Sequence, residues 1–150
     1  MDYSQLFSVL RISGSGLTAQ RKMIEATSSN IANIETTDTD TGGPYIPKRV
    51  NFKSVNGNET FGSFLNRMRG DNRSDYGDMV EASTVDEVRS PTKMEYEPEN
   101  PMANEQGYIE KPNINLTMEM GNMMVASRAY EANVTVMNAA KAMMKKALEI

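Results

Sequence analysis

Two rows of apolar residues, one near each end of the 150-residue chain, repeat at intervals of seven and constrain the fold more than any other feature. A seven-residue apolar period is the pattern of a helix that packs along a seam against another helix. The sequence therefore predicts a long helix at each end, over residues 1–36 and 113–150. The rows are Leu10, Leu17, Ile24 and Ile31 at the N-terminus, and Leu116, Met123, Tyr130, Met137 and Met144 at the C-terminus.

Local signals modify this prediction at particular points. Gly14 and Gly16 each weaken a helix by roughly 1 kcal/mol relative to alanine, which predicts either a bend or late ordering near residues 13–16. Pro112 and Asn113 precede the C-terminal helix as a stop and a cap. Small residues flank both rows and allow another helix to approach closely. These residues are Ala19 and Ala26 in the first helix, and Ala126, Ala140 and Ala147 in the second.

The middle segment, residues 37–112, differs in composition from both ends, because it holds all six prolines and seven of the ten glycines. Alternating apolar residues predict short strands at 45–52, 79–88 and 93–96, with Ile46, Val50 and Phe52 facing inward and Pro47 confining the first strand to an edge. The polar residues 53–78 predict a mobile insert. These strands are enough for a small, partly open β subdomain but not for a sandwich.

Together these patterns predict a mainly α fold with a small β-rich middle. The long terminal helices pair as a coiled-coil-like hairpin, and the short β/loop subdomain is inserted between them. Each helix carries an apolar stripe that is wider than one partner helix covers. Seven of the 13 methionines lie between residues 118 and 144, and methionine adapts to neighbours of different shape. The spare stripe is either ordinary core or an assembly surface, and the pattern alone leaves both open.

The composition excludes several classes of function. The chain has no cysteine and no histidine, so disulfides, thiolate nucleophiles, Cys/His zinc sites and histidine triads are impossible. Its net charge of −4 argues against nucleic acid as a partner. No apolar run reaches the roughly 18–20 residues that membrane insertion requires. Asp2 stands where a secretory signal has basic residues, so we expect any export to proceed without a cleaved signal peptide.

Three short motifs suggest chemistry, and each has a simpler interpretation. Gly14–Ala19 matches a dinucleotide-binding fingerprint, but the seven-residue row runs through it without a change of period. Residues 38–43 begin like a calcium loop, but Arg49 stands where the bidentate glutamate belongs. Glu95, Glu97 and Glu99 alternate as a charged strand edge does. The sequence therefore predicts no catalytic, cofactor-binding or metal-binding residue and no cofactor.

The motifs at the two ends resemble those of the bacterial flagellar axial proteins, which form the rod and the hook. The N-terminal motif is Ser29-Asn30-Ile31-Ala32-Asn33, and the C-terminal motif runs from Ala126-Ser127-Arg128 through Tyr130-Glu131-Ala132-Asn133 to Met137-Asn138. The tract from Tyr96 to Ile114 resembles a proximal-rod member of the basal-body rod family. The resemblance covers roughly residues 6–52 and 93–150.

This resemblance implies a non-enzymatic structural subunit of the flagellar proximal rod, the drive shaft that transmits torque. The implied location is the basal body, where the rod spans the periplasm within the cell envelope. The implied partners are further copies of the chain, the other proximal-rod subunits, the distal-rod subunit, the rod-base junction protein at the export gate, and the flagellar type III export apparatus. Another short axial protein of the rod is the alternative.

Assembly would then proceed through helix–helix packing of the termini, which we expect to fold only when neighbours are present. Asn30, Asn33 and Asn133 are expected to fix the register between helices, although Asn33 fits a capping role equally well. The predicted assembly interface comprises Leu10, Leu17, Ile24, Asn30, Ile31, Asn33, Leu116, Met120, Met123, Tyr130, Asn133, Val134, Met137, Met144 and Leu148.

Overall fold

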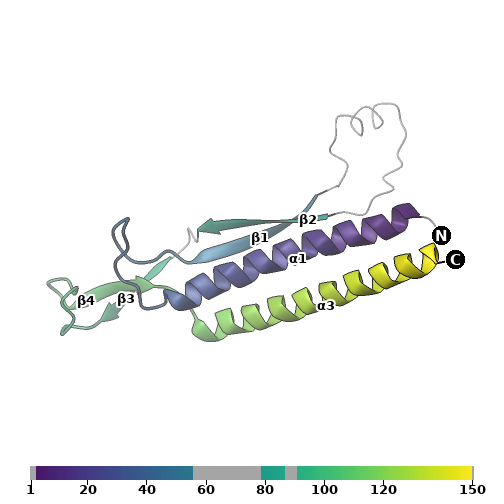
Figure 1. Cartoon of the computed structure of the whole chain (residues 1–150). Helices are drawn as coiled ribbons and strands as arrows, with labels where there is room; N and C mark the ends of the chain where they lie inside the picture. The colour runs from purple at the N-terminus through teal and green to yellow at the C-terminus, as the bar shows by residue number, and fades with distance from the viewer. Residues whose placement is uncertain (1–2, 56–78, 87–90, 150) are drawn as a thin grey trace, which may run out of the picture. The chain divides into compact units, whose positions relative to one another are not determined.

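The computed structural model describes residues 3–55, 79–86 and 91–149. Two long helices enclose four short strands in the chain order (Figure 1). The elements are α1 (Tyr3–Ala32), β1 (Lys48–Val55), β2 (Met79–Asp86), β3 (Thr92–Tyr96), β4 (Tyr108–Pro112) and α3 (Leu116–Leu148). The prediction of a mainly helical chain with a small β middle is confirmed.

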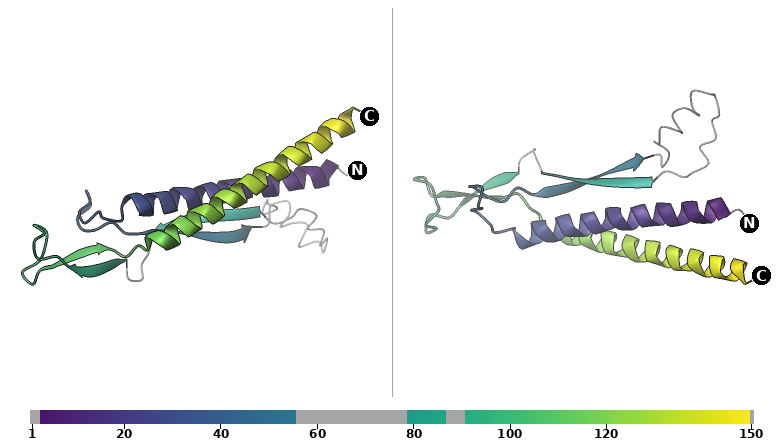
Figure 2. Two further views of the ribbon diagram at one scale, coloured as in Figure 1. Left: turned by 90° about the horizontal axis from the view of Figure 1, so that it is seen from below. Right: turned by 45° about the horizontal axis from the view of Figure 1, so that its top comes forward.

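The chain divides into two compact units, and both helices contribute to each of them. The first unit contains α1 up to Arg21 and α3 from Arg128 onward, together with the adjoining ends of β1 and β2. The second unit contains the remainder of α1 and α3, the start of β1 and the β3–β4 pair. Within each unit α1 and α3 run in opposite directions (Figure 2).

Helix α1 is continuous from Tyr3 to Ala32, so the predicted bend at 13–16 is wrong. Side chains near the glycines bond within the helix, since Ser15 Oγ donates to the carbonyl of Ile12 at 2.8 Å and Thr18 Oγ1 donates to that of Gly14 at 3.1 Å. Gly16 also lies against a side chain of α3. Tertiary packing therefore overrides the low helix propensity of glycine here.

Helix α3 begins two residues later than its predicted cap implies. Asn115 is the cap, because its Oδ1 accepts the backbone N–H of Met118 at 3.1 Å and its carbonyl accepts that of Glu119 at 3.0 Å. The predicted cap, Asn113, instead donates its backbone N–H to the carbonyl of Pro91 at 2.9 Å. Gly121 does not interrupt the helix, which continues to Leu148.

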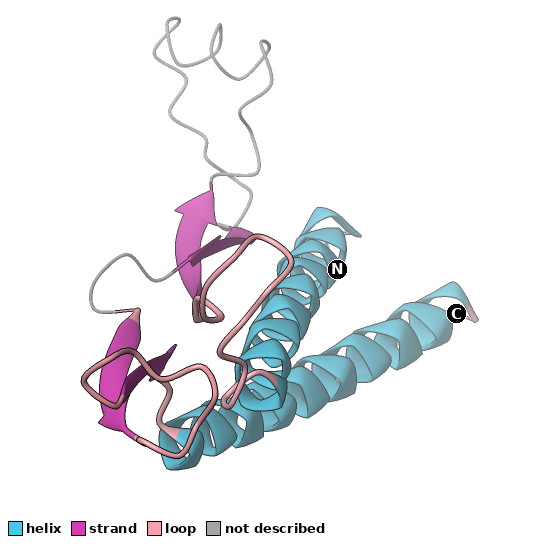
Figure 3. Ribbon diagram, turned by 90° about the vertical axis from the view of Figure 1, so that its left-hand side faces the viewer, coloured by secondary structure: helices cyan, strands magenta, loops and turns pink. Residues whose placement is uncertain are grey.

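The strands form two separate two-stranded sheets, β1–β2 and β3–β4 (Figure 3). The second is antiparallel and pairs Thr92 with Pro112 and Tyr96 with Tyr108. Strand β4 was not predicted. Strand β1 extends to Val55, into the predicted insert, and the rest of that insert, 56–78, lies outside the described residues.

Small and polar side chains occupy the buried positions of the helices, whereas the predicted seam rows do not. In the first unit Ser13, Ala19 and Ala140 are at most 6% exposed. In the second unit Ala126 is fully buried, and Ala26, Thr27 and Asn30 are at most 5% exposed. The residues of the N-terminal row are only half-buried. The flanking alanines, rather than the apolar rows, therefore lie at the centre of each unit.

The structure also bears on other predictions from the sequence. Ile46 and Phe52 are each 46% exposed, so their predicted inward orientation is wrong. Gly14–Ala19 is helical throughout and follows helix rather than a strand, so the dinucleotide-binding interpretation is wrong. Across the described residues, no helix is long and apolar enough to cross a membrane. Nor do those residues gather three acidic side chains in a geometry that holds a metal ion.

Candidate assembly interface

Asn30, in the second unit, makes four hydrogen bonds and is only 2% exposed. Its Oδ1 accepts the backbone N–H of Lys48 at 2.8 Å and the hydroxyl of Tyr45 at 3.1 Å. Its Nδ2 donates to the carbonyl of Lys48 at 2.9 Å and to Oε2 of Glu119 at 3.2 Å. One amide thus joins α1 to the first residue of β1 and to the first turn of α3.

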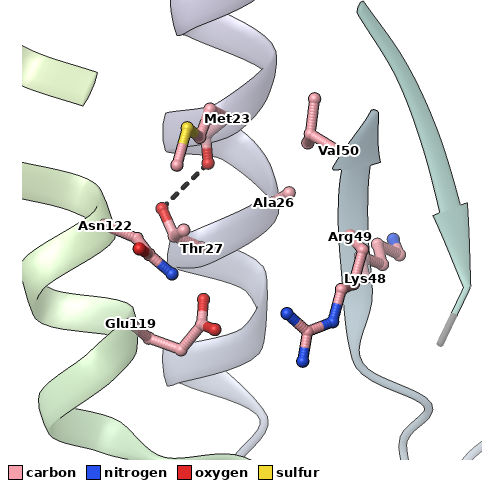
Figure 4. A pocket seen from close by; sticks show the side chains of 8 residues that line it. All are labelled: Met23, Ala26, Thr27, Lys48, Arg49, Val50, Glu119 and Asn122. Atoms are coloured by element: carbon pink, nitrogen blue, oxygen red, sulfur yellow. Dashed lines mark hydrogen bonds between the residues drawn. The ribbon is translucent and has the colours of Figure 1, made fainter. Parts of the chain in front are cut away.

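A small hollow of about 100 Å³ opens beside this amide, between α1, β1 and α3 (Figure 4). Thr27 is held there by bonds from its hydroxyl to the carbonyls of Met23 and Ile24. The hollow combines one carboxylate, two basic side chains and an apolar floor. The lining residues are Met23, Ala26, Thr27, Lys48, Arg49, Val50, Glu119 and Asn122.

In the first unit, α1 approaches α3 closely at Gly16. A Cβ atom added to Gly16 would lie 2.9 Å from Nδ2 of Asn133 and 3.5 Å from its Cγ. By contrast, nothing lies within 4 Å of a Cβ added to Gly14. Gly16 is therefore a contact glycine, and Asn133 occupies the space that its missing side chain leaves.

Strand β2 is attached to α1 in the same unit. Ser15 Oγ accepts the backbone N–H of Val80 at 3.1 Å, and the guanidinium of Arg11 donates to Sδ of Met79 at 3.8 Å. Ala82, on the same strand, is 5% exposed. Helix α1 therefore contacts the sheet as well as α3, which explains why both of its flanks are partly covered.

The predicted interface residues fall into different environments. Asn30 is buried, and Asn33 is half-buried, with local bonds to the carbonyl of Ser29 and the hydroxyl of Thr36. A second group is half-buried within the units: Leu10, Leu17, Ile24, Ile31, Met123, Asn133, Val134, Met137 and Met144. The remaining four are exposed, by 45% for Leu116, 57% for Met120, 37% for Tyr130 and 77% for Leu148.

Helix α3 also exposes apolar side chains that were absent from the predicted set. Val125 is 65% exposed, Met124 58%, Met143 51%, Met118 50% and Val136 45%. Residues 118, 125, 132 and 139 repeat at seven-residue intervals, so a second apolar row runs beside the first. This second row has the same seven-residue spacing as the first, so the sequence contained the signal that predicts it.

A buried cation fixes the β3–β4 hairpin to the segment after α1. The side chain of Lys111 is 11% exposed, and its Nζ contacts Glu97 closely, Glu35 at 3.5 Å and Glu95 at 3.7 Å. The hydrogen bond from Lys111, with a second from Asn100, lowers the pKa of Glu97. The same bond to Glu97 raises the pKa of Lys111. Two of the alternating glutamates, Glu95 and Glu97, are thus counter-ions of one lysine, which the sequence did not predict.

The comparisons with known proteins place this arrangement among flagellar rod proteins. Residues 10–38 match the family described as flagella basal body rod protein, and residues 105–150 match the flagellar basal body rod FlgEFG protein C-terminal family. The flagellar basal-body rod proteins FlgC of Borreliella burgdorferi and Bacillus subtilis are 41% and 42% identical to the chain, over 97% and 96% of it and 97% of each relative. FlgC of Salmonella typhimurium is 36% identical, over 97% of both chains.

Proposed function

Since the chain belongs to the flagellar basal-body rod proteins and is a structural subunit of the proximal rod, we propose that its exposed helix rows join it to neighbouring rod subunits. Torque then passes from subunit to subunit through these contacts. The subunit supplies rigid packing rather than catalysis, as expected for relatives that are rod proteins.

The observation that supports this proposal is the exposed apolar surface of α3. Nine large apolar side chains of this one helix are exposed, from 37% for Tyr130 to 77% for Leu148. Scattered exposed apolar residues are normal, but a contiguous row along a helix marks an interaction surface. The row at residues 118, 125, 132 and 139 has the period of a helix that packs along another helix.

Within the subunit, α1 and α3 pair as a coiled-coil-like hairpin whose centre is lined by small residues. Gly16 against Asn133 and Asn30 against Glu119 are the contacts that carry this pairing. Such a centre buries little apolar area, so the helices become stably ordered only when neighbours cover their outer faces.

The partners under this proposal are other copies of the chain, the second type of proximal-rod subunit, the distal-rod subunit and the rod-base junction protein at the export gate. The subunit reaches its place in the envelope-spanning rod through the flagellar type III export apparatus. A chain with no cysteine cannot form disulfides on that route. Identity of 36–42% with FlgC over nearly the whole chain favours this subunit type over another short axial protein.

The test is to place a charge in the exposed row. Val125→Asp is expected to abolish incorporation into isolated basal bodies and to stop swimming, because the carboxylate would be buried unpaired against a neighbour. Thr135→Asp, at an exposed polar position of the same helix, is the matched control and is expected to incorporate normally. Normal incorporation of Val125→Asp would contradict the assignment of this row to an interface.

A further inference from the structure

The outer face of the β3–β4 hairpin is apolar and uncovered by any described residue. Met94 is 66% exposed, Tyr96 62% and Tyr108 42%, and Met102, in the loop between the strands, is 56% exposed. Met94 and Tyr96 alternate with Lys93 and Glu95 and therefore share one face of the strand. Tyr108 pairs with Tyr96 across the hairpin, and their rings meet edge to face at 5.2 Å. We call these four residues the hairpin patch.

The hairpin also carries exposed carboxylates: Glu110 is paired with Met94 across the strands, and Glu99 and Glu105 are in the loop that contains Met102. Glu99, Glu105 and Glu110 are all exposed, and none of them makes an ion pair with a described residue. Both lysines of the hairpin are already engaged, Lys93 with Glu95 at 3.4 Å and Lys111 with Glu97. The hairpin therefore presents apolar side chains together with carboxylates that pair with no described cation. A complementary partner presents apolar and basic side chains together.

The last turns of α3 have that complementary character. Lys141, Met144, Lys145 and Leu148 are spaced as i, i+3, i+4 and i+7, so they lie on one face of the helix. Leu148 is 77% exposed. The side chain of Lys145 is 80% exposed, and its ion pair with Glu149 at 3.9 Å is at the limit of contact. We call this face the lysine stripe.

The hairpin patch lies in the second unit and the lysine stripe in the first, so every copy of the chain offers both surfaces to a neighbouring copy.

We propose that the hairpin patch of one copy binds the lysine stripe of the next copy. The apolar side chains of the two surfaces meet, and Glu99, Glu105 and Glu110 pair with the lysines. Because two different surfaces are joined, the contact is heterologous and propagates into an open assembly rather than a closed dimer. This inference rests on the proposed function, since it names one partner surface within the rod.

Charge reversal tests the proposal. Glu99→Lys/Glu105→Lys on the hairpin, and Lys141→Glu/Lys145→Glu on the stripe, each turn attraction into repulsion. Each variant is expected to incorporate into basal bodies about tenfold less well than the wild type in co-expression. Expressed as the sole copy, the chain with all four reversals is expected to incorporate better than either reversed pair expressed in the same way, because both surfaces of every copy then change sign. Asp38→Lys/Asp40→Lys, in an exposed turn, is the control that should incorporate normally.

Wild-type incorporation of either charge-reversed pair would overturn the proposal. So would failure of the fourfold reversal to incorporate better than either reversed pair, because a different protein partner cannot change sign together with this chain. Absence of wild-type chain from basal bodies would instead overturn the proposed function. The two failures are thus distinguishable.

A second measurement leaves the charges unchanged. The chain has no cysteine, so Met102→Cys and Leu148→Cys each introduce a unique thiol. A short bismaleimide is expected to give cross-linked dimers in basal bodies that contain both variants, and none when either variant is present alone. Cross-linking of Met102→Cys to a different protein, or no dimer from the mixture, would overturn the proposal.

Discussion

Gly16 provides a direct test of the pairing between α1 and α3. Alanine at a helix-interior glycine stabilises a helix by roughly 1 kcal/mol. At Gly14 nothing lies within 4 Å of the added Cβ, so the full gain is expected. At Gly16 the added Cβ would lie 2.9 Å from Nδ2 of Asn133 and must displace it. Gly14→Ala and Gly16→Ala therefore form a matched pair that differs only in this contact.

The energetic cost of Gly16→Ala depends on how the contact with Asn133 relaxes. If only the Asn133 amide rotates away, an unfavourable rotamer costs about 0.5–1.5 kcal/mol. If the helices must separate instead, overpacking costs about 1–3 kcal/mol. Either cost offsets the propensity gain, so the paired helices should be less stable in Gly16→Ala than in Gly14→Ala by about 1–2 kcal/mol. In an unpaired helix the two substitutions should raise helix stability by the same amount.

The assay compares the two variants in free and assembled chains. Circular dichroism of the free chain is expected to show the same small gain in helix for both. In co-expression with the wild type, a deficit of about 1.4 kcal/mol makes Gly16→Ala about tenfold scarcer in basal bodies than Gly14→Ala. Asn133→Ala removes the obstructing amide, and in the same chain it is expected to restore the incorporation of Gly16→Ala into basal bodies. Equal incorporation of the two glycine variants would refute the close approach at Gly16.

Three further outcomes are expected. Purified chain at low concentration should show far less helix by circular dichroism than the 63 residues of α1 and α3, and a fully helical monomer would contradict folding on assembly. Asn30→Asp should reduce incorporation because it places a second carboxylate beside Glu119, and Glu119→Gln in the same chain should partly restore it. Because the folded pKa of Glu97 lies below 4.5, its pair with Lys111 should stabilise the hairpin above that pH and lose this effect as the pH falls through the folded value. The raised pKa of Lys111 keeps the lysine charged throughout this acid range, and Lys111→Met should flatten the acid end of the pH profile of tyrosine near-ultraviolet dichroism.

Helix periodicity was the most reliable guide that the sequence offered. The seven-residue rows predicted both long helices, because an apolar period reports on many residues at once. The details that failed depend on single residues. The choice of Asn115 over Asn113 as the cap depends on where the chain leaves β4, and that strand was itself missed. Strand β4 is five residues long and ends at a proline, so it carries little signal apart from its pairing with β3.

The contacts that define the candidate interface are non-local, which is why the sequence could indicate the residues but not their roles. Asn30 was expected to set the register between helices, yet two of its four bonds reach the backbone of Lys48. Gly16 was interpreted as a weakness because propensity describes only the local chain. Lys111 gave no signal, because its three counter-ions lie at positions 35, 95 and 97 and meet only in the folded second unit.

The distribution of apolar residues explains why such a subunit depends on its neighbours. The helices bury alanine, serine, threonine and asparagine between them and expose nine large apolar side chains on α3. Complete burial of such a side chain is worth about 1.5–3 kcal/mol, and roughly half of each is already covered, so α3 retains on the order of 10 kcal/mol to be gained on assembly. The translational and rotational freedom lost on association costs about 4–15 kcal/mol before any ordering, so a contact that covers only some of these nine side chains is too weak to hold a subunit. Stable incorporation therefore requires several neighbours at once, which favours growth at the end of an existing rod over association of free subunits.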